Sequence, residues 1–117
     1  MNINNYRNNT SDTPAAPHFR LAAQLRCTEK PSLSDSARQS YEHYCIRFGN
    51  WAWGKYQCPF VLNARPFVKD FLNHLVEKGY SRYTVHRYAC ALKTLYLCEI
   101  TDFGVVLPQR KKKDITK

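Results

Sequence analysis

The side chains best suited to chemistry lie on one face of the segment between Arg82 and Cys98. When successive residues are placed about 100° apart, as in a helix, the apolar residues fill one arc. The remaining arc contains no acidic residue and consists of Arg82, Tyr83, His86, Arg87, Cys90, Lys93 and Thr94. Basic donors with small or planar neighbours allow a helix to approach a phosphate-lined groove. An ordinary solvated basic helix is the alternative explanation for this face alone.

A second acid-free strip lies on the segment from Asp35 to Lys55. Its polar side chains lie opposite an aromatic stripe at helical spacing, and they are Gln39, His43, Arg47 and Asn50. Glutamine, asparagine and arginine present planar edges that match adenine and guanine in the major groove. Because solvated helices also carry such residues, the prediction that this strip reads bases depends on its occurrence together with the first face.

The charge of the chain is basic and unevenly distributed. The formal net charge is +9 at pH 7, and residues 79–117 contribute eight bases and three acids to it. The C-terminal basic run consists of Arg110, Lys111, Lys112 and Lys113. Lysine and arginine displace the counterions that condense on nucleic acid, so DNA or RNA is the expected partner. We therefore include the basic run among the candidate DNA-binding residues.

No residue pattern indicates an enzymatic site. The acids are scattered singly, no serine or cysteine lies in a nucleophile turn, and the four glycines form no phosphate loop. Asp102-Phe103-Gly104 matches the magnesium-binding triplet of protein kinases, but the other kinase motifs are missing. The five cysteines lack the spacing of a zinc site. We expect no catalytic residue, metal or cofactor, and we expect the cysteines to serve as small apolar core residues.

Local start and stop signals predict an all-α bundle of four to five helices. We expect a flexible leader over residues 1–17, a helical domain over 18–107 and a basic linker over 108–117. The expected helices run from His18 to Thr28, from Asp35 to Lys55, from Asn63 to Gly79 with Pro66 in the first turn, and from Arg82 to Cys98. Ser34 and Ser81 are placed to cap the second and the fourth of these helices.

Apolar stripes on these helices predict the core. The inward residues are expected to be Phe19, Leu21, Ala22 and Leu25 on the first helix; Ala37, Tyr41, Tyr44, Cys45, Phe48, Trp51 and Ala52 on the second; Val68, Phe71, Leu72, Leu75 and Val76 on the third; and Val85, Tyr88, Ala89, Leu92, Leu95 and Tyr96 on the fourth. No apolar run reaches the roughly 18 residues of a membrane span, and the polar N-terminus is unlike a signal peptide. We therefore expect a cytoplasmic protein.

Three segments share a pattern with a known family. They are Ser40-Tyr41 through Phe48-Gly49-Asn50-Trp51, the stretch Val68 to Leu75, and Gly79-Tyr80-Ser81-Arg82-Tyr83-Thr84-Val85 followed by Ala91-Leu92-Lys93-Thr94-Leu95-Tyr96. With these segments, the chain from Ser34 to Lys117 resembles the N-terminal core-binding domain, also described as SAM-like, of tyrosine recombinases and phage integrases. The last segment is the most specific, and the tail from Asp102 onward is similar to the lead-in to a catalytic domain in integrases of bacterial mobile elements.

The resemblance implies a helical half-clamp that lies over the major groove at a recombination core site. The implied partners are double-stranded DNA, the catalytic domain of the same parent chain and other recombinase protomers on DNA. The implied location is the bacterial cytoplasm, in association with the nucleoid. In this family the catalytic arginines, lysine, histidines and tyrosine belong to a later domain without a counterpart here. We therefore expect the chain to position DNA without cutting it.

Two other functions remain open. A stand-alone helical DNA-binding regulator of the helix-turn-helix kind requires a three- to four-residue turn with a glycine, which residues 55–62 fit badly. A helical protein interaction module would use the region around Trp51 and Trp53, since Ile46 and Trp53 lie outside the main apolar stripe. Coverage of the first helix by Ile46 and Trp53 is the simpler explanation of their position.

Overall fold

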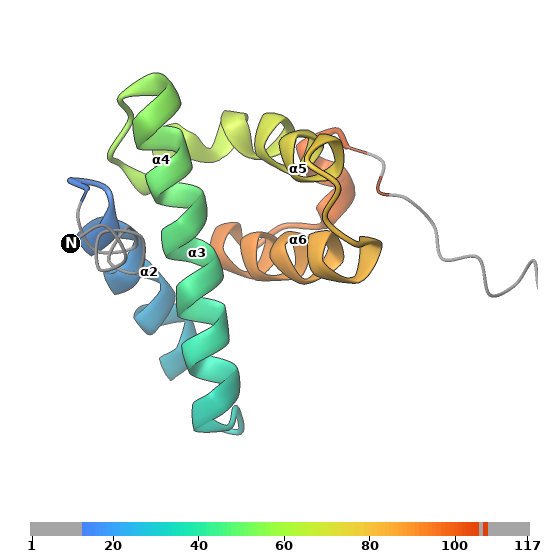
Figure 1. Cartoon of the computed structure of the whole chain (residues 1–117). Helices are drawn as coiled ribbons and strands as arrows, with labels where there is room; N and C mark the ends of the chain where they lie inside the picture. The colour runs from blue at the N-terminus through green and yellow to red at the C-terminus, as the bar shows by residue number, and fades with distance from the viewer. Residues whose placement is uncertain (1–12, 106, 108–117) are drawn as a thin grey trace, which may run out of the picture.

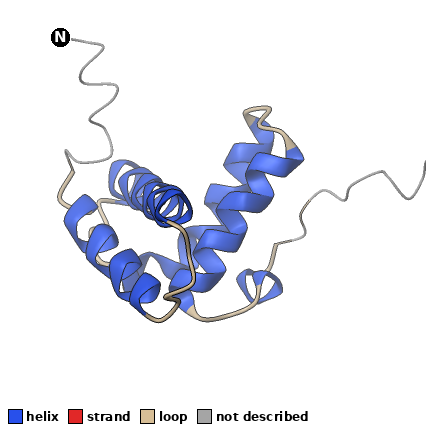
Figure 2. Ribbon diagram, turned by 90° about the horizontal axis from the view of Figure 1, so that it is seen from below, coloured by secondary structure: helices blue, strands red, loops and turns tan. Residues whose placement is uncertain are grey.

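The structure is a computed structural model that describes residues 13–105 and 107. These residues form helices and loops without any strand (Figure 1, Figure 2), which confirms the all-α prediction. In chain order the elements are α2 (Ala16–Thr28), α3 (Asp35–Tyr56), α4 (Val61–Ala64), the 3₁₀ helix η1 (Arg65–Phe67), α5 (Val68–Glu77), α6 (Arg82–Tyr96) and the 3₁₀ helix η2 (Ile100–Phe103).

The two helices that carry most of the candidate residues are capped as predicted. Ser34 accepts a hydrogen bond from the backbone N–H of Ala37 at 3.1 Å, and Ser81 accepts one from Thr84 at 3.1 Å. Such caps satisfy N–H groups that have no partner within the helix. α6 ends at Tyr96, and the next residue, Leu97, takes a left-handed conformation with φ of 56°. The caps therefore set where the polar faces of α3 and α6 begin.

The third predicted helix is divided into three pieces. α4 is a single turn, η1 follows it, and α5 begins only at Val68. Pro66 lies in η1 and has no N–H with which to continue α-helical hydrogen bonding. The end of α5 agrees with the prediction: Gly79 has a φ of 92°, and the N–H of Tyr80 donates to the carbonyl of Leu75 at 3.1 Å.

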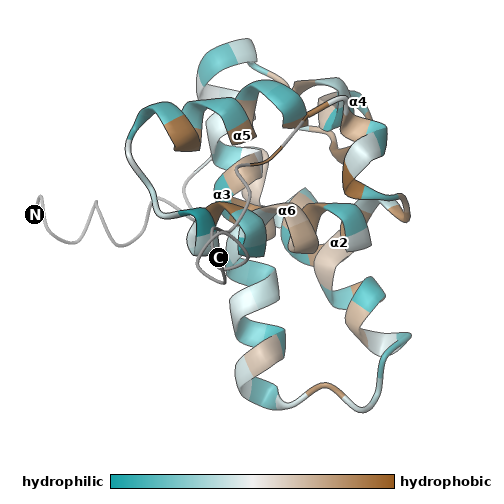
Figure 3. Cartoon of the chain, turned by 90° about the vertical axis from the view of Figure 1, so that its right-hand side faces the viewer, coloured by the Kyte–Doolittle hydropathy of each residue, from teal (hydrophilic) through white to brown (hydrophobic). Residues whose placement is uncertain are grey.

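α3 lies between α2 on one side and the pair α5 and α6 on the other (Figure 1). On the α5 and α6 side, the ring centroid of Phe71 is 5.2 Å from Phe48, 5.3 Å from Trp51 and 5.5 Å from Tyr88. Hydrophobic and hydrophilic residues alternate along α5 in Figure 3, as expected for a helix with one buried face. The stripes of α3 and α6 face this core as predicted, but Val76 in the last turn of α5 is exposed.

α2 packs on α3 in a different phase from the one predicted. It begins two residues earlier, within the expected leader, and its buried residues are Ala16, Phe19, Ala23 and Cys27. The prediction that Leu21 and Leu25 face inward is wrong, since they are 59% and 54% exposed. Phe19 fits against α3 because Gly49 has no side chain: a Cβ there would lie 2.4 Å from the ring. The contact with α3, rather than the apolar pattern of α2, therefore decides which face is buried.

The segment after α6 completes the core. Phe103 and Val105 are both buried. Asp102 accepts a hydrogen bond from the backbone N–H of Glu99 at 2.9 Å, and Gly104 has a φ of 78°. The kinase-like triplet is thus part of a turn that places a phenylalanine in the core.

Candidate nucleic-acid interface

Arg87 joins the predicted DNA face of α6 to α3. Its Nε donates a hydrogen bond to the hydroxyl of Tyr44 at 3.1 Å, and its Nη1 donates one to the hydroxyl of Tyr83 at 2.6 Å. The guanidinium also lies 5.9 Å from the ring of Tyr44 and 5.2 Å from that of Tyr83, within the range of cation–π attraction. An exposed arginine side chain is thereby held in one orientation while part of its donor set remains available.

Arg47 and His43 border the same point from α3. Arg47 Nη1 lies 3.2 Å from His43 Nε2, and because arginine only donates, this nitrogen must be the acceptor of a neutral imidazole. Partial burial, and then the charge of Arg47, lower the pKa of His43. Burial raises the pKa of Tyr88 on α6, and the charge and hydrogen bonding of Arg47 counteract this rise. Arg47 therefore adjoins α6, and His43 lies beside Arg47 on α3.

The other two residues of the α3 strip lie apart from this group. Asn50 is half-buried and accepts a hydrogen bond from the hydroxyl of Thr13, just before α2. Gln39 is exposed two turns before Arg47. The strip predicted as one base-reading surface is divided, because α2 covers the side of α3 on which Asn50 lies.

The remaining residues of the α6 face follow two patterns. Arg82, Tyr83 and His86 are exposed on its first two turns, and His86 Nε2 lies 3.4 Å from the sulfur of Cys90. Further along, the amino group of Lys93 lies 3.9 Å from Glu99, and Thr94 is half-buried. The face is acid-free within the helix, as the sequence indicates, but the chain that follows α6 brings a carboxylate beside its end.

Tyr44 is the residue of this interface that the sequence prediction missed. Its place in the apolar stripe predicted a core role, and its ring does pack on Tyr88 with centroids 4.5 Å apart. Its hydroxyl nevertheless reaches the surface and accepts from Arg87. A tyrosine at the edge of a buried stripe is typical of such a position, because the ring is apolar and the hydroxyl seeks a partner. The predicted run Arg110, Lys111, Lys112 and Lys113 lies outside the described residues.

The described residues contain no group of three histidine, cysteine or acidic side chains that could hold a metal ion. All five cysteines are free, and Cys27 and Cys45 are buried. Burial raises the pKa of both thiols, which keeps them protonated and poorly nucleophilic. These two cysteines therefore serve as core residues, as predicted.

Comparisons with known proteins returned no match to this chain among family models, curated proteins or solved structures. Among the described helices, none combines the length and the apolar character needed to span a membrane. The functional proposal therefore rests on the residues and on their geometry.

Proposed function

We propose that this chain is a DNA-binding helical domain that positions a site-specific recombinase of the tyrosine recombinase class on its core site. The proposal assigns the chemistry of DNA cleavage to a separate catalytic domain and assigns binding to this chain. Its proposed partners are double-stranded DNA, that catalytic domain and further recombinase protomers, within the bacterial cytoplasm.

One observation carries the proposal. The acid-free faces of α3 and α6, which are far apart in the sequence, meet at Arg87, where Tyr44 and Tyr83 orient the guanidinium. On α3, Arg47 interacts with Tyr88, whose ring packs on Tyr44, and Arg47 also lacks a carboxylate partner among the described ion pairs. Two arginines without neutralising acids form a surface complementary to a polyanion.

The geometry suggests that α6 and α3 contact different parts of the DNA. Arg87 has donors left for a phosphate after its two bonds to tyrosine, and Arg82 lies at the start of the same helix. Phosphate contacts fix register and orientation without reading sequence. Arg47 and His43 lie on the neighbouring helix and carry the planar groups suited to base edges. We therefore assign phosphate contacts to the α6 residues and base contacts to Arg47 and His43.

A helix-turn-helix regulator is the second candidate, and the link between α5 and α6 favours it. This link has four residues, Lys78–Ser81, and includes Gly79 with its left-handed φ, which suits that motif. The two helices run in opposite directions in Figure 1, whereas the motif crosses its helices at roughly 90 to 120°. In such a regulator α6 alone would read the groove, so loss of Arg47 would leave binding unchanged.

A charge-matched pair of double variants tests the proposal. One double variant combines Arg47→Ala and Arg87→Ala, and the other combines Lys69→Ala and Lys78→Ala. Fluorescence anisotropy with a labelled duplex, at several salt concentrations, would compare the binding of the two. Both double variants lose two positive charges, but Lys69 lies exposed on α5 and Lys78 lies exposed directly after it. We expect the arginine pair to weaken binding and to lower the salt slope by about 0.9, since Arg87 contributes one phosphate contact and Arg47 a base contact.

The control pair should change binding little. A larger loss from the lysine pair would place the DNA on the opposite surface and overturn the assignment. A loss confined to Arg87, with Arg47→Ala binding a preferred duplex selected from random sequences like the unchanged protein, would favour the helix-turn-helix candidate.

A further inference from the structure

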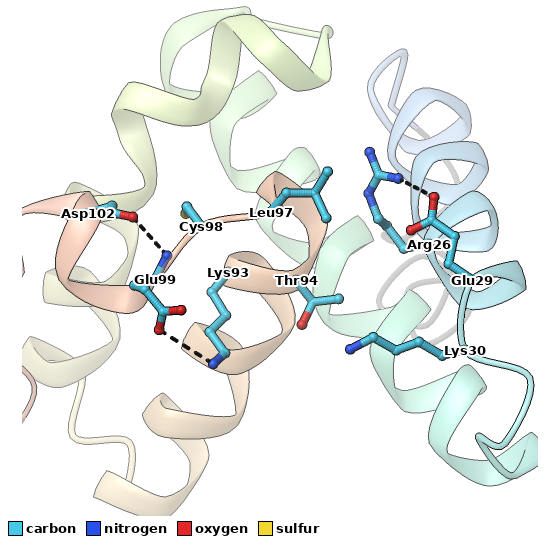
Figure 4. A pocket seen from close by; sticks show the side chains of 9 residues that line it. All are labelled: Arg26, Glu29, Lys30, Lys93, Thr94, Leu97, Cys98, Glu99 and Asp102. Atoms are coloured by element: carbon cyan, nitrogen blue, oxygen red, sulfur yellow. Dashed lines mark hydrogen bonds and ion pairs between the residues drawn. The ribbon is translucent and has the colours of Figure 1, made fainter.

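A polar pocket lies at the far end of the α6 face, between the C-terminal ends of α2 and α6 and the helix η2. Its charged lining consists of three basic side chains, Arg26 from α2, Lys30 from the link to α3 and Lys93 from α6, and three acidic ones, Glu29, Glu99 and Asp102. The amino groups of Lys30 and Lys93 lie on either side of the hydroxyl of Thr94 (Figure 4). Two amines and a hydroxyl around one opening match the donors that bind a phosphate oxygen.

The charges in this pocket are unequally available to a ligand. Arg26 is occupied, since it bonds Glu29 at 3.0 Å and the carbonyl of Leu95 at 3.3 Å. Lys93 is only loosely paired, because Glu99 lies 3.9 Å away. Lys30 is exposed and forms no ion pair with the described residues. Lys30 therefore supplies a free positive charge, and Glu99 competes with any anion for Lys93.

The pocket lies on the same side of α6 as the side chain of Arg87. Thr94 follows Arg87 by seven residues, so both side chains lie on the same side of α6, about 10 Å apart along its axis. The major groove of B-form DNA is about 12 Å wide. The spacing between Arg87 and the pocket is thus close to the width of the groove, which suits contacts from both to the phosphates of one duplex.

We infer that Lys30, Thr94 and Lys93 bind a phosphate group, and that this group is a backbone phosphate of the duplex bound by Arg87. The second part of the inference rests on the proposed function. The pocket is a second anchor for DNA, and it depends on Lys30, a residue from outside both predicted faces. Glu99 weakens this anchor by holding Lys93.

Two substitutions with opposite expected signs test the inference by duplex anisotropy on the whole chain. Lys30→Ala should weaken binding and lower the salt slope by about 0.9, whereas Lys78→Ala, the same change in the link after α5, should not. Glu99→Gln should strengthen binding by up to about fivefold by releasing Lys93, whereas the matched change Glu77→Gln should have no effect. Thermal unfolding would confirm that all four variants remain folded.

A titration with inorganic phosphate separates this inference from the proposed function. We expect phosphate to shift the NMR amide signal of Thr94 in the unchanged protein and not in Lys30→Ala. DNA binding that requires Arg87 but ignores Lys30 and Glu99 would overturn the second anchor alone. A phosphate-dependent shift without any DNA binding would overturn the proposed function and the assignment to a DNA backbone, and would make the pocket a site for free phosphate.

Discussion

The two sides of α3 are built in different ways. Toward α2 the contact depends on a missing side chain, because Phe19 occupies the space above Gly49. Toward α5 and α6 the contact is made by aromatic rings. The ring centroids of Phe48 and Phe71 are 5.2 Å apart, and those of Tyr44 and Tyr88 are 4.5 Å apart. One side gains stability from close approach of two helices, and the other from buried aromatic volume.

The charges of α3 follow the same division. Glu42 faces α2, where it lies 4.0 Å from Arg20. On the opposite side Arg47 borders Tyr88 of α6 and has no carboxylate partner among the described ion pairs. The side of α3 with the aromatic core thus also carries the proposed DNA-binding residues, while the α2 side carries an ion pair between α2 and α3.

The largest expected effect tests the aromatic side of α3. Phe71→Ala, or Leu92→Ala on α6, should lower the free energy of unfolding by about 2 to 5 kcal/mol because each leaves a cavity in the core. Chemical denaturation followed by circular dichroism measures this. Val76→Ala on exposed α5 surface is the control, and a core variant as stable as this control would show that the aromatic contacts are misassigned.

The next effect tests the α2 side with two glycines of the same helix. Gly49→Ala should destabilise by roughly 1 to 3 kcal/mol because its Cβ would meet the ring of Phe19. Gly54→Ala has no atom within 4 Å of its Cβ and should stabilise by about 0.5 to 1 kcal/mol through helix propensity. Equal stability changes in denaturant melts would contradict close packing of α2 on α3.

A third pair separates function from stability across α3. Once a preferred duplex has been selected from random sequences, Arg47→Ala should cost about 1 to 3 kcal/mol of binding free energy there and much less on other duplexes. Asn50→Ala, which removes the acceptor of the Thr13 hydroxyl, should instead lower stability by about 1 kcal/mol. A sequence-selective loss of binding in Asn50→Ala would show that Asn50 reads bases together with Arg47, as the sequence predicted.

The smallest expected effect tests the orientation of Arg87. Tyr44→Phe keeps the ring in the core and removes the hydroxyl that accepts from Arg87, so DNA affinity should fall by roughly 0.5 to 1.5 kcal/mol with little change in thermal midpoint. Tyr56→Phe removes the hydroxyl that donates to Asp70 at 2.9 Å, away from this surface. Equal DNA affinities of the two variants would show that the hydroxyl does not position the guanidinium.

Much of the fold was predictable because its signals are local. The hydroxyls of Ser34 and Ser81 cap N–H groups three residues away, and Gly79 ends α5 with a backbone angle that other residues rarely adopt. The long stripes of α3 and α6 determine their buried faces for the same reason. The break at Pro66 was missed because the first turn of an α-helix also tolerates proline.

The sequence by itself determined an all-α chain, the caps of its long helices and the basic side chains that their faces carry. Only the tertiary structure decided that Arg87 meets Tyr44, that Asn50 turns to α2, and that Glu99 lies beside Lys93. Helical periodicity specifies which side chains share a face, since that depends on neighbours within a few residues. Which faces meet depends on shape, such as the space above Gly49, and on chain segments that return from far along the sequence.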